Sequence, residues 1–225
     1  MIKALLFDLD NTLLDFVKMK ITCSKASVKA MIKAGLKMTE KDAYTKLMSI
    51  YAKTSYEDPV IFENFLKEFN KKIDYKILSA AIVAYRRVVN DLLIPYEGVT
   101  ETLKILKRKG LILGIVTDAP RLKAWIRLTT AGLSNYFNLI ITLGDSKRRK
   151  PHKIPFQKAL RELKLKPEEV LFIGDNPEKD IAGANKIGMK TVLAKYGSFI
   201  KSKSINKDEK PTYIINKFNE LLRLI

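Results

Sequence analysis

The residues best suited to chemistry in this sequence are carboxylates that follow short apolar runs. Asp8 and Asp10 close the first run, and Asp175 closes a later one, with Asp180 shortly after it. Buried carboxylates are costly unless a cation or another partner offsets their charge. Hard oxygen ligands suit Mg²⁺, which keeps several waters and takes only one or two carboxylates. These acids therefore predict a Mg²⁺ site, with Asp118 as a further candidate.

Two other residues suit a phosphoryl group held beside such a metal. Thr117 follows another apolar run, and Lys150 lies in a loop further along the chain. A hydroxyl and an ammonium group beside a metal ion neutralise a phosphoryl group from several sides. Taken alone, Lys150 is also typical of a surface lysine, and Asp180 of an acid favoured at a helix N-terminus. The combination favours phosphoryl-transfer chemistry.

The elements that must position these residues alternate along the second part of the chain. The apolar runs are typical of buried parallel strands, and the segments between them have helical spacing. This alternation predicts an α/β fold with a doubly wound parallel sheet. Expected strands span 2–8, 112–117, 139–142, 170–174, 191–194 and 213–215, and expected helices span 99–109, 121–131, 155–163, 179–187 and 217–224. Ligands bind outside the carboxyl ends of such strands, so the candidate residues should converge there.

Residues 16–90 have a different pattern, with apolar residues recurring at three and four positions. The pattern predicts about four helices, broken near Gly35, at Asp58-Pro59 and near Asp74. We therefore expect an α/β core domain of residues 1–15 and 93–225, split after its first strand by a smaller all-helical domain of residues 16–92.

Taken together and in order, the motifs resemble the four-motif signature of the haloacid dehalogenase (HAD) superfamily. They are Asp8-Leu9-Asp10-Asn11-Thr12, then Thr117 after a strand, then Lys150-Pro151, then Gly174-Asp175 with Asp180. The order and spacing fit over nearly the whole chain. The resemblance implies a Rossmann-like core, and the helical domain resembles that family's cap. The chain is also similar to a prokaryotic HAD subfamily whose members are named glyceraldehyde 3-phosphate phosphatases.

The resemblance implies a catalytic role for each of four residues. Asp8 would be the nucleophile that attacks phosphorus. Asp10 would be the general acid that protonates the leaving oxygen, and then the base that activates water. Thr117 would hydrogen-bond a phosphoryl oxygen, and Lys150 would neutralise the phosphate and the Asp8 carboxylate. Backbone N–H groups after Asp8 would surround the phosphate.

The resemblance also implies how the metal is held. Asp8, the backbone carbonyl group of Asp10 and Asp175 would bind Mg²⁺, and Asp180 would orient the water shell of the metal. Many relatives have Asn or Gly after the motif threonine, so Asp118 is a departure whose role stays open.

Asp10 also bears on the reaction, because dehalogenases of this superfamily lack an acid two positions after the nucleophile. We expect a magnesium-dependent phosphatase that hydrolyses a small phosphomonoester through an aspartyl-phosphate intermediate. Sugar and triose phosphates, glyceraldehyde 3-phosphate and phosphoglycolate are candidate substrates, which a closing cap would shield from water. Phosphomutases keep both acids, so a sugar phosphomutase is a second hypothesis.

The charge of the chain motivates a third hypothesis. Lys and Arg number 42 against 24 Asp and Glu, a net charge of +18, which favours anionic partners. A basic nucleic-acid-binding protein on a HAD fold would have this charge, but no aromatic-plus-basic stacking motif supports it. The basic cluster within residues 147–153 is typical of a solvated surface. The single histidine, His152, is typical of a loop residue.

Other features bear on location and assembly. The apolar runs are far shorter than the roughly 18 residues of a spanning helix, and the N-terminus lacks a signal-peptide pattern, so we expect a cytoplasmic protein without a membrane partner. A single cysteine, Cys23, excludes an intrachain disulfide, and one histidine argues against a zinc site. Monomer and homodimer are both open.

Overall fold

The computed structural model describes residues 1–198 and 206–225 of the chain. The chain forms two compact units, Met1–Asp15 with Ile94–Ile225, and Phe16–Leu93. We call them the core unit and the helical unit. The first boundary, between Asp15 and Phe16, coincides with the one expected from the sequence, and the second lies one residue further along the chain.

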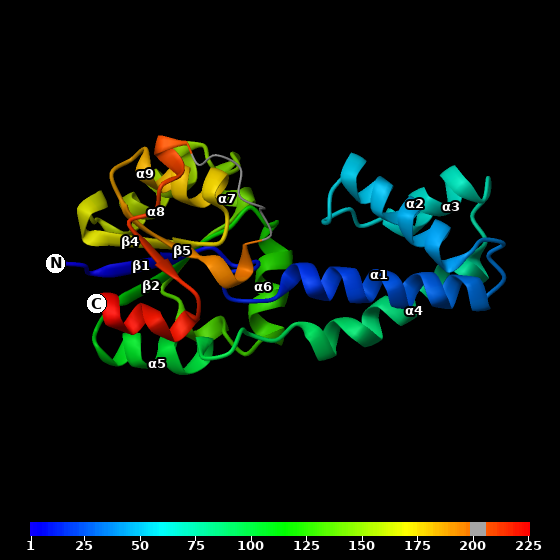
Figure 1. Cartoon of the computed structure of the whole chain (residues 1–225), viewed down its shortest axis with the longest axis horizontal. Coiled ribbons are helices and arrows are strands. Elements are labelled where there is room, and N and C mark those ends of the chain that lie inside the picture. Colours follow the sequence, from blue (N-terminus) through cyan, green and yellow to red (C-terminus); the bar gives the residue numbers. More distant parts are fainter. Residues whose placement is uncertain (199–205) are drawn as a thin grey trace. The chain divides into compact units, whose positions relative to one another are not determined.

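Within the described residues, the core unit is built on a six-stranded sheet with the order β3-β2-β1-β4-β5-β6. The strands are β1 (Ala4–Phe7), β2 (Ile112–Val116), β3 (Leu139–Ile141), β4 (Val170–Gly174), β5 (Lys190–Ala194) and β6 (Tyr213–Ile215). All neighbouring strands pair in parallel. The α/β fold with a doubly wound parallel sheet is therefore confirmed, and the strand order reverses around β1 (Figure 1).

Helical segments cover both faces of this sheet, and the central strands β1 and β4 are accordingly buried along their whole length. One face packs against α8 (Lys153–Leu163) and α9 (Ala182–Asn185), and the other against α5 (Val99–Arg108) and the 3₁₀ segment η6 (Phe218–Leu224) (Figure 1). Successive side chains of a strand point to opposite faces. Leu6 accordingly joins the cluster around Phe156 and Phe172 under α8, whereas Phe7 packs its ring against Phe218.

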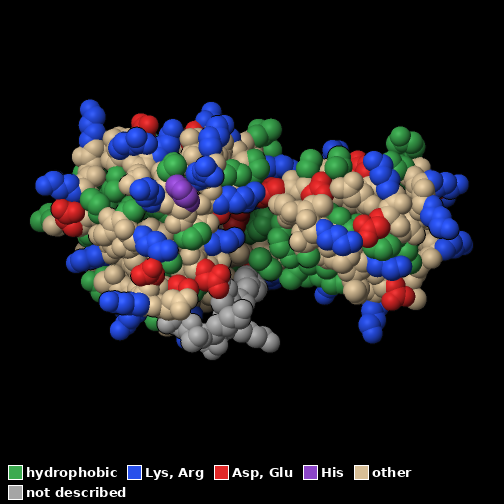
Figure 2. Space-filling model, turned by 90° about the horizontal axis from the view of Figure 1, so that it is seen from above, with side chains coloured by type: hydrophobic (Ala, Val, Ile, Leu, Met, Phe, Trp, Pro, Cys, Tyr) green, Lys and Arg blue, Asp and Glu red, His purple; other side chains and the backbone are tan. Residues whose placement is uncertain are grey.

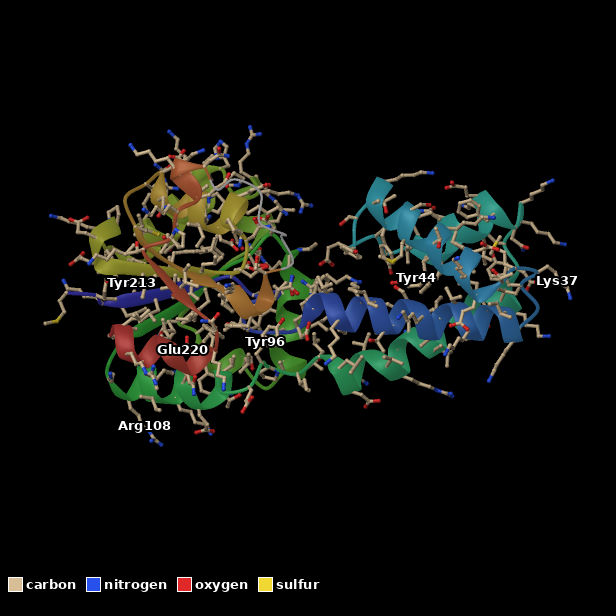
Figure 3. All side chains as sticks on the ribbon, in the orientation of Figure 1. Lys37, Tyr44, Tyr96, Arg108, Tyr213 and Glu220 are labelled. Atoms are coloured by element: carbon tan, nitrogen blue, oxygen red, sulfur yellow. The ribbon has the colours of Figure 1, made fainter. Side chains whose placement is uncertain are left out.

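The helical unit consists of α1 (Phe16–Lys33), α2 (Glu40–Lys53), α3 (Ile61–Phe69) and α4 (Tyr75–Leu92). These helices begin and end near the breaks expected from the sequence. Its own apolar core includes Met31, Leu47 and Phe65, all fully buried. In both units long charged side chains such as Lys37 and Arg108 extend away from the ribbon (Figure 3). No described helix is both long and apolar enough to cross a membrane.

Two expected helices differ in the structure. The segment predicted as one helix over 179–187 is a π-helical turn, η3 (Pro177–Ile181), followed by the short α9. The reason is local: the Asn176 side chain accepts the Lys179 N–H, and the Asp180 carboxylate accepts the Asn176 N–H, so side chains organise this turn. The last expected helix, 217–224, has 3₁₀ geometry as η6.

Candidate active site at the carboxyl edge of the sheet

The central strand places Asp8 between two neighbouring strand ends. Phe7 of β1 is in register with Ile115 of β2 and with Ile173 of β4. The Asp8 N–H continues this pairing by donating to the Ile173 carbonyl group at 2.8 Å. Thr117 and Asp175, the residues that follow β2 and β4, therefore emerge on either side of Asp8.

Three of the predicted acids form one buried cluster. Asp8, Asp175 and Asp180 each offer a carboxylate oxygen, and these oxygens all lie within 4.8 Å of one another. All three side chains are buried, Asp180 almost completely. The hydroxyl of Thr12 donates to Asp175 Oδ1 at 3.4 Å. The sheet edge thus holds an oxygen-rich site of the kind that hard cations prefer.

Lys150 reaches into this cluster from the loop before α8. Its Nζ lies 2.5 Å from Asp8 Oδ1 and 2.6 Å from Asp180 Oδ1, and it donates to the Val116 carbonyl oxygen at 3.1 Å. Its side chain is 3% exposed, so it is not a surface lysine. This ammonium group links the nucleophile candidate to the acid of η3.

Burial and crowding of like charges shift the pKa values in the cluster. Burial raises the pKa of Asp8 to about 7, an effect that Lys150 opposes and that Asp180 and Asp10 reinforce. Burial raises the pKa of Asp175 to about 9, reinforced by the charges of Asp180 and Asp8. Burial lowers the pKa of Lys150, but the neighbouring carboxylates of Asp180 and Asp8 outweigh that effect and raise it. The cluster therefore favours additional positive charge near neutral pH.

A divalent cation fits this site by charge and by donor type. Lys150 offsets one of the three carboxylate charges of Asp8, Asp175 and Asp180, so two negative charges remain when all three are ionised. Carboxylate oxygens are the donors that Mg²⁺ selects in proteins. The cluster could thus bind a metal ion, with Asp180 the most deeply buried of the three donors.

Asp180 depends on a glycine at the end of β4. A Cβ atom at Gly174 would overlap the Asp180 side chain, so the carboxylate packs directly against the strand backbone. The Asp180 Oδ2 atom also accepts the Asn176 N–H at 3.0 Å. Gly174 and Asn176, which precede η3, therefore hold Asp180 from two sides.

Thr117 and Asp118 lie at the end of β2 and hold the neighbouring loops. The Thr117 hydroxyl accepts the Ala119 N–H at 3.1 Å, and Thr117 is buried next to Val116, the residue whose carbonyl group binds Lys150. Asp118 Oδ1 accepts the backbone N–H of Lys150 at 2.9 Å. The sequence left the role of Asp118 open, and the structure shows that it anchors the loop that carries the site lysine.

Asp10 contacts a residue that sequence reasoning missed. Arg127, on α6 (Arg121–Thr130), donates from Nη1 to Asp10 Oδ2 at 2.7 Å. Its buried neighbours on the helix are Ala124 and Leu128, at the spacing of one helix face. A charged residue on the apolar face of an amphipathic helix is the signal in the sequence that could have identified it.

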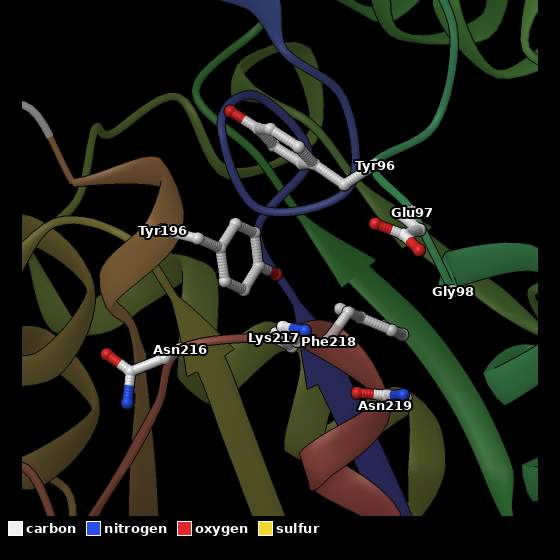
Figure 4. Close-up of a pocket in the computed structure, with 8 residues that line it drawn as sticks. All are labelled: Tyr96, Glu97, Gly98, Tyr196, Asn216, Lys217, Phe218 and Asn219. Carbon is white, nitrogen blue, oxygen red and sulfur yellow. The ribbon is translucent and has the colours of Figure 1, made fainter.

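The loop after β1 is supported from the other side by η4 (Lys195–Gly197). The Tyr196 hydroxyl donates to the Thr12 carbonyl oxygen at 2.7 Å, and a Cβ atom at Gly197 would overlap the backbone of Asn11. Tyr196 also lines a groove in the core unit, where its ring packs edge-on against that of Tyr96 (Figure 4). The groove is lined by Tyr96, Glu97, Gly98, Tyr196, Asn216, Lys217, Phe218 and Asn219.

The remaining basic residues of the lysine loop have structural contacts. His152 caps α8 by accepting the Ile154 N–H, in agreement with its interpretation as a loop residue. The Arg148 carbonyl group accepts the Ser146 hydroxyl, and the Arg149 carbonyl group accepts the His152 N–H. Their side chains are exposed, as expected for a solvated cluster.

Comparisons with known proteins agree with this geometry. Residues 5–194 match the model of the family described as haloacid dehalogenase-like hydrolase, so the chain belongs to this family. It is 34% identical over 227 residues to the glyceraldehyde 3-phosphate phosphatase of Methanopyrus kandleri, covering all of this chain and 97% of the relative. It is 31% identical to the pyrophosphatase PpaX of Bacillus mycoides, covering all of this chain and 96% of that protein.

A solved structure also shares the fold. The crystal structure of YfnB from Bacillus subtilis, described as a HAD-hydrolase bound to magnesium, superposes with a TM-score of 0.72 at 23% identity, covering 99% of this chain and 98% of the other. The resemblance to the HAD superfamily is therefore confirmed, and the chain is a hydrolase acting on phosphate esters.

Proposed function

We propose that this protein is a magnesium-dependent phosphatase that hydrolyses a small phosphomonoester through an aspartyl-phosphate intermediate on Asp8. The observation that carries the proposal is the buried cluster of Asp8, Asp175 and Asp180 around the Lys150 ammonium group. Phosphoryl transfer through an aspartyl phosphate needs a nucleophilic carboxylate close to a cation site and to a fixed lysine. The cluster and Lys150 would supply all three at one edge of the sheet.

The proposed reaction has two steps. An Asp8 carboxylate oxygen attacks phosphorus, the bond to the leaving oxygen breaks, and Asp10 donates a proton to that oxygen. A water molecule then attacks the phosphorus of the aspartyl phosphate while Asp10 takes its proton, which releases inorganic phosphate and restores the Asp8 carboxylate. Lys150 and Thr117 neutralise and orient the phosphoryl oxygens throughout.

The metal would be held by Asp8, the Asp10 carbonyl group and Asp175, with Asp180 beside them. When bound, Mg²⁺ supplies positive charge against the phosphoryl oxygens. One relative is named glyceraldehyde 3-phosphate phosphatase. On the basis of that name we propose triose phosphates and similar three-carbon or two-carbon esters, including phosphoglycolate, as the substrate class of this chain. In the same proposal the helical unit is the cap that selects among them.

Phosphate release from an aryl phosphate and a panel of small phosphometabolites tests the proposal. The assay is run with Mg²⁺, with EDTA and with Asp8→Asn. We expect release that requires Mg²⁺ and is lost in Asp8→Asn while the far-ultraviolet circular dichroism spectrum is retained. Normal turnover by Asp8→Asn would exclude Asp8 as the nucleophile, and full activity in EDTA would exclude the metal requirement.

A further inference from the structure

Arg127 is a buried charge in a helix whose other inward-facing residues are apolar. Its side chain is 6% exposed, and it lies between Ala124 and Leu128 on the inner face of α6. Burying a guanidinium group costs several kcal/mol unless hydrogen bonds and an opposite charge compensate it. A residue of this kind is therefore expected to have a specific partner.

That partner is the candidate general acid. The 2.7 Å bond from Arg127 Nη1 to Asp10 Oδ2 joins residues 117 positions apart in the sequence. Charge-assisted bonds of this length are the stronger class of hydrogen bond, and the planar guanidinium group loses little freedom in forming them. The Asp10 side chain is 20% exposed and follows a strand end, and this bond restricts the rotation of its carboxyl group.

We propose that Arg127 is a positioning residue that orients the Asp10 carboxyl group for proton transfer to the leaving oxygen and from the attacking water. This assignment rests on the proposed function. Arginine stays protonated in proteins and cannot itself exchange the proton. By holding Oδ2, Arg127 sets the orientation of the Asp10 carboxyl group. Small errors in such geometry are expensive, because proton transfer requires hydrogen-bond distance in the reacting complex.

The assignment predicts that the effect of losing Arg127 depends on the leaving group. An alkyl oxygen must be protonated as it leaves, whereas 4-nitrophenolate leaves without a proton. Correctly placed general acids contribute about 10²- to 10⁴-fold. Two quantities are compared between Arg127→Met and the unmodified enzyme: kcat/KM on glycerol phosphate, and the rate of the first-turnover burst of 4-nitrophenol from 4-nitrophenyl phosphate. The fold-decrease in the first should exceed the fold-decrease in the second by at least about tenfold. The burst isolates attack by Asp8 from the later water step.

Three further variants complete the experiment. Asp10→Asn should show the same leaving-group pattern, and the double variant should lose little more than Asp10→Asn alone, because the two residues act as one unit. Arg127→Lys should recover part of the alkyl activity. Arg121→Met is the matched control: it lies on the same helix, is 63% exposed and pairs with Asp145, so both activities should stay near those of the unmodified enzyme.

The possible results separate the proposals. Equal losses on both substrates, or additive losses in the double variant, would overturn the positioning role and indicate a structural or phosphate-binding arginine. An increase in KM alone would do the same. If circular dichroism shows that Arg127→Met is unfolded, the leaving-group comparison in Arg127→Lys tests the positioning role instead. No burst and no phosphate release by the unmodified enzyme would overturn the proposed function itself, together with this assignment.

Discussion

Lys150 is the residue on which the charge balance of the site depends. Its ammonium group lies 2.5 Å from Asp8 and 2.6 Å from Asp180, and its own backbone N–H is held by Asp118. A buried lysine in this position lowers the repulsion between carboxylates, and in the proposed function it supplies a fixed charge for a phosphoryl group. Removing one partner of a buried pair is more damaging than removing both.

Replacing Lys150 should therefore impair both activity and stability. In Lys150→Met we expect kcat to fall by about 10²- to 10³-fold, the usual cost of losing a fixed electrostatic contact. The melting temperature should fall more at pH 8 than at pH 6, because Asp8 and Asp175, with pKa values of about 7 and 9, take up protons at the lower pH. Calorimetry at both values measures this. Exposed Lys153→Met is the control, and an equal drop at both pH values would contradict the argument.

Asp118 acts on the same lysine through the backbone. Asp118→Asn keeps an oxygen that can accept the Lys150 N–H, whereas Asp118→Ala removes it. Loss of a supporting contact of this kind costs about 10- to 100-fold in activity. We expect a decrease in that range for Asp118→Ala and less than about threefold for Asp118→Asn, measured as kcat on the best panel substrate. Equal effects of the two variants would show that the carboxylate charge, not the loop anchor, matters.

At the scale of the element, the turn η3 is shaped by the contact between Gly174 and Asp180. Gly174→Ala would push the Asp180 carboxylate away from the strand, because the added Cβ atom has no room. Overpacking costs about 1–3 kcal/mol, and displacement of a supporting carboxylate weakens metal binding by about tenfold or more. Denaturant unfolding and calorimetric titration with Mg²⁺ measure the two effects.

A second glycine provides the control for this prediction. Gly144 lies in the short helix α7 (Leu143–Ser146), where an added Cβ atom meets its neighbours only at ordinary contact distance. Alanine is favoured over glycine inside helices, so Gly144→Ala should be neutral or stabilising by up to about 1 kcal/mol. Unchanged Mg²⁺ affinity in Gly174→Ala would show that Asp180 does not support the metal.

The elements also show where sequence reasoning succeeds and where it stops. The strands were predictable because buried parallel strands have continuous apolar runs. The convergence of the polar residues that follow them was predictable because the carboxyl ends of these strands share one edge of the sheet. The π-helical turn was not, since side chains of Asn176 and Asp180 decide it. The bond between Arg127 and Asp10 was also not predictable, because it depends on how α6 packs beside the end of β1.

At the scale of the whole molecule, the basic surface contrasts with an acidic site. Lys and Arg side chains are spread over the visible face of each unit, interspersed with Asp and Glu (Figure 2). Such a charge of +18 attracts anionic substrates over a distance and does not select among them. Selection must come from the site, where the carboxylate charges would repel a phosphate in the absence of a cation.

The same carboxylates make the stability of the protein depend on pH and on metal. Asp8 and Asp175 have an ordinary pKa of 3.8, against about 7 and about 9 in the folded protein. Between about pH 4 and pH 9 the metal-free folded state therefore binds more protons than the unfolded state, and its free energy of unfolding falls as pH rises. The raised pKa of Lys150 does not act in this window, because lysine is protonated throughout it in both states.

Magnesium should replace these protons and reverse the trend. A cation that binds the folded state stabilises it more where fewer protons compete for the same oxygens. We expect saturating Mg²⁺ to raise the melting temperature more at pH 8 than at pH 6, and Asp175→Asn to reduce both the pH dependence without metal and the gain with metal. Differential scanning calorimetry in buffers of matched ionic strength measures this, with Ca²⁺-free and EDTA-treated samples as references. A magnesium gain that is the same at both pH values, or that survives in Asp175→Asn, would show that the ion binds away from this cluster.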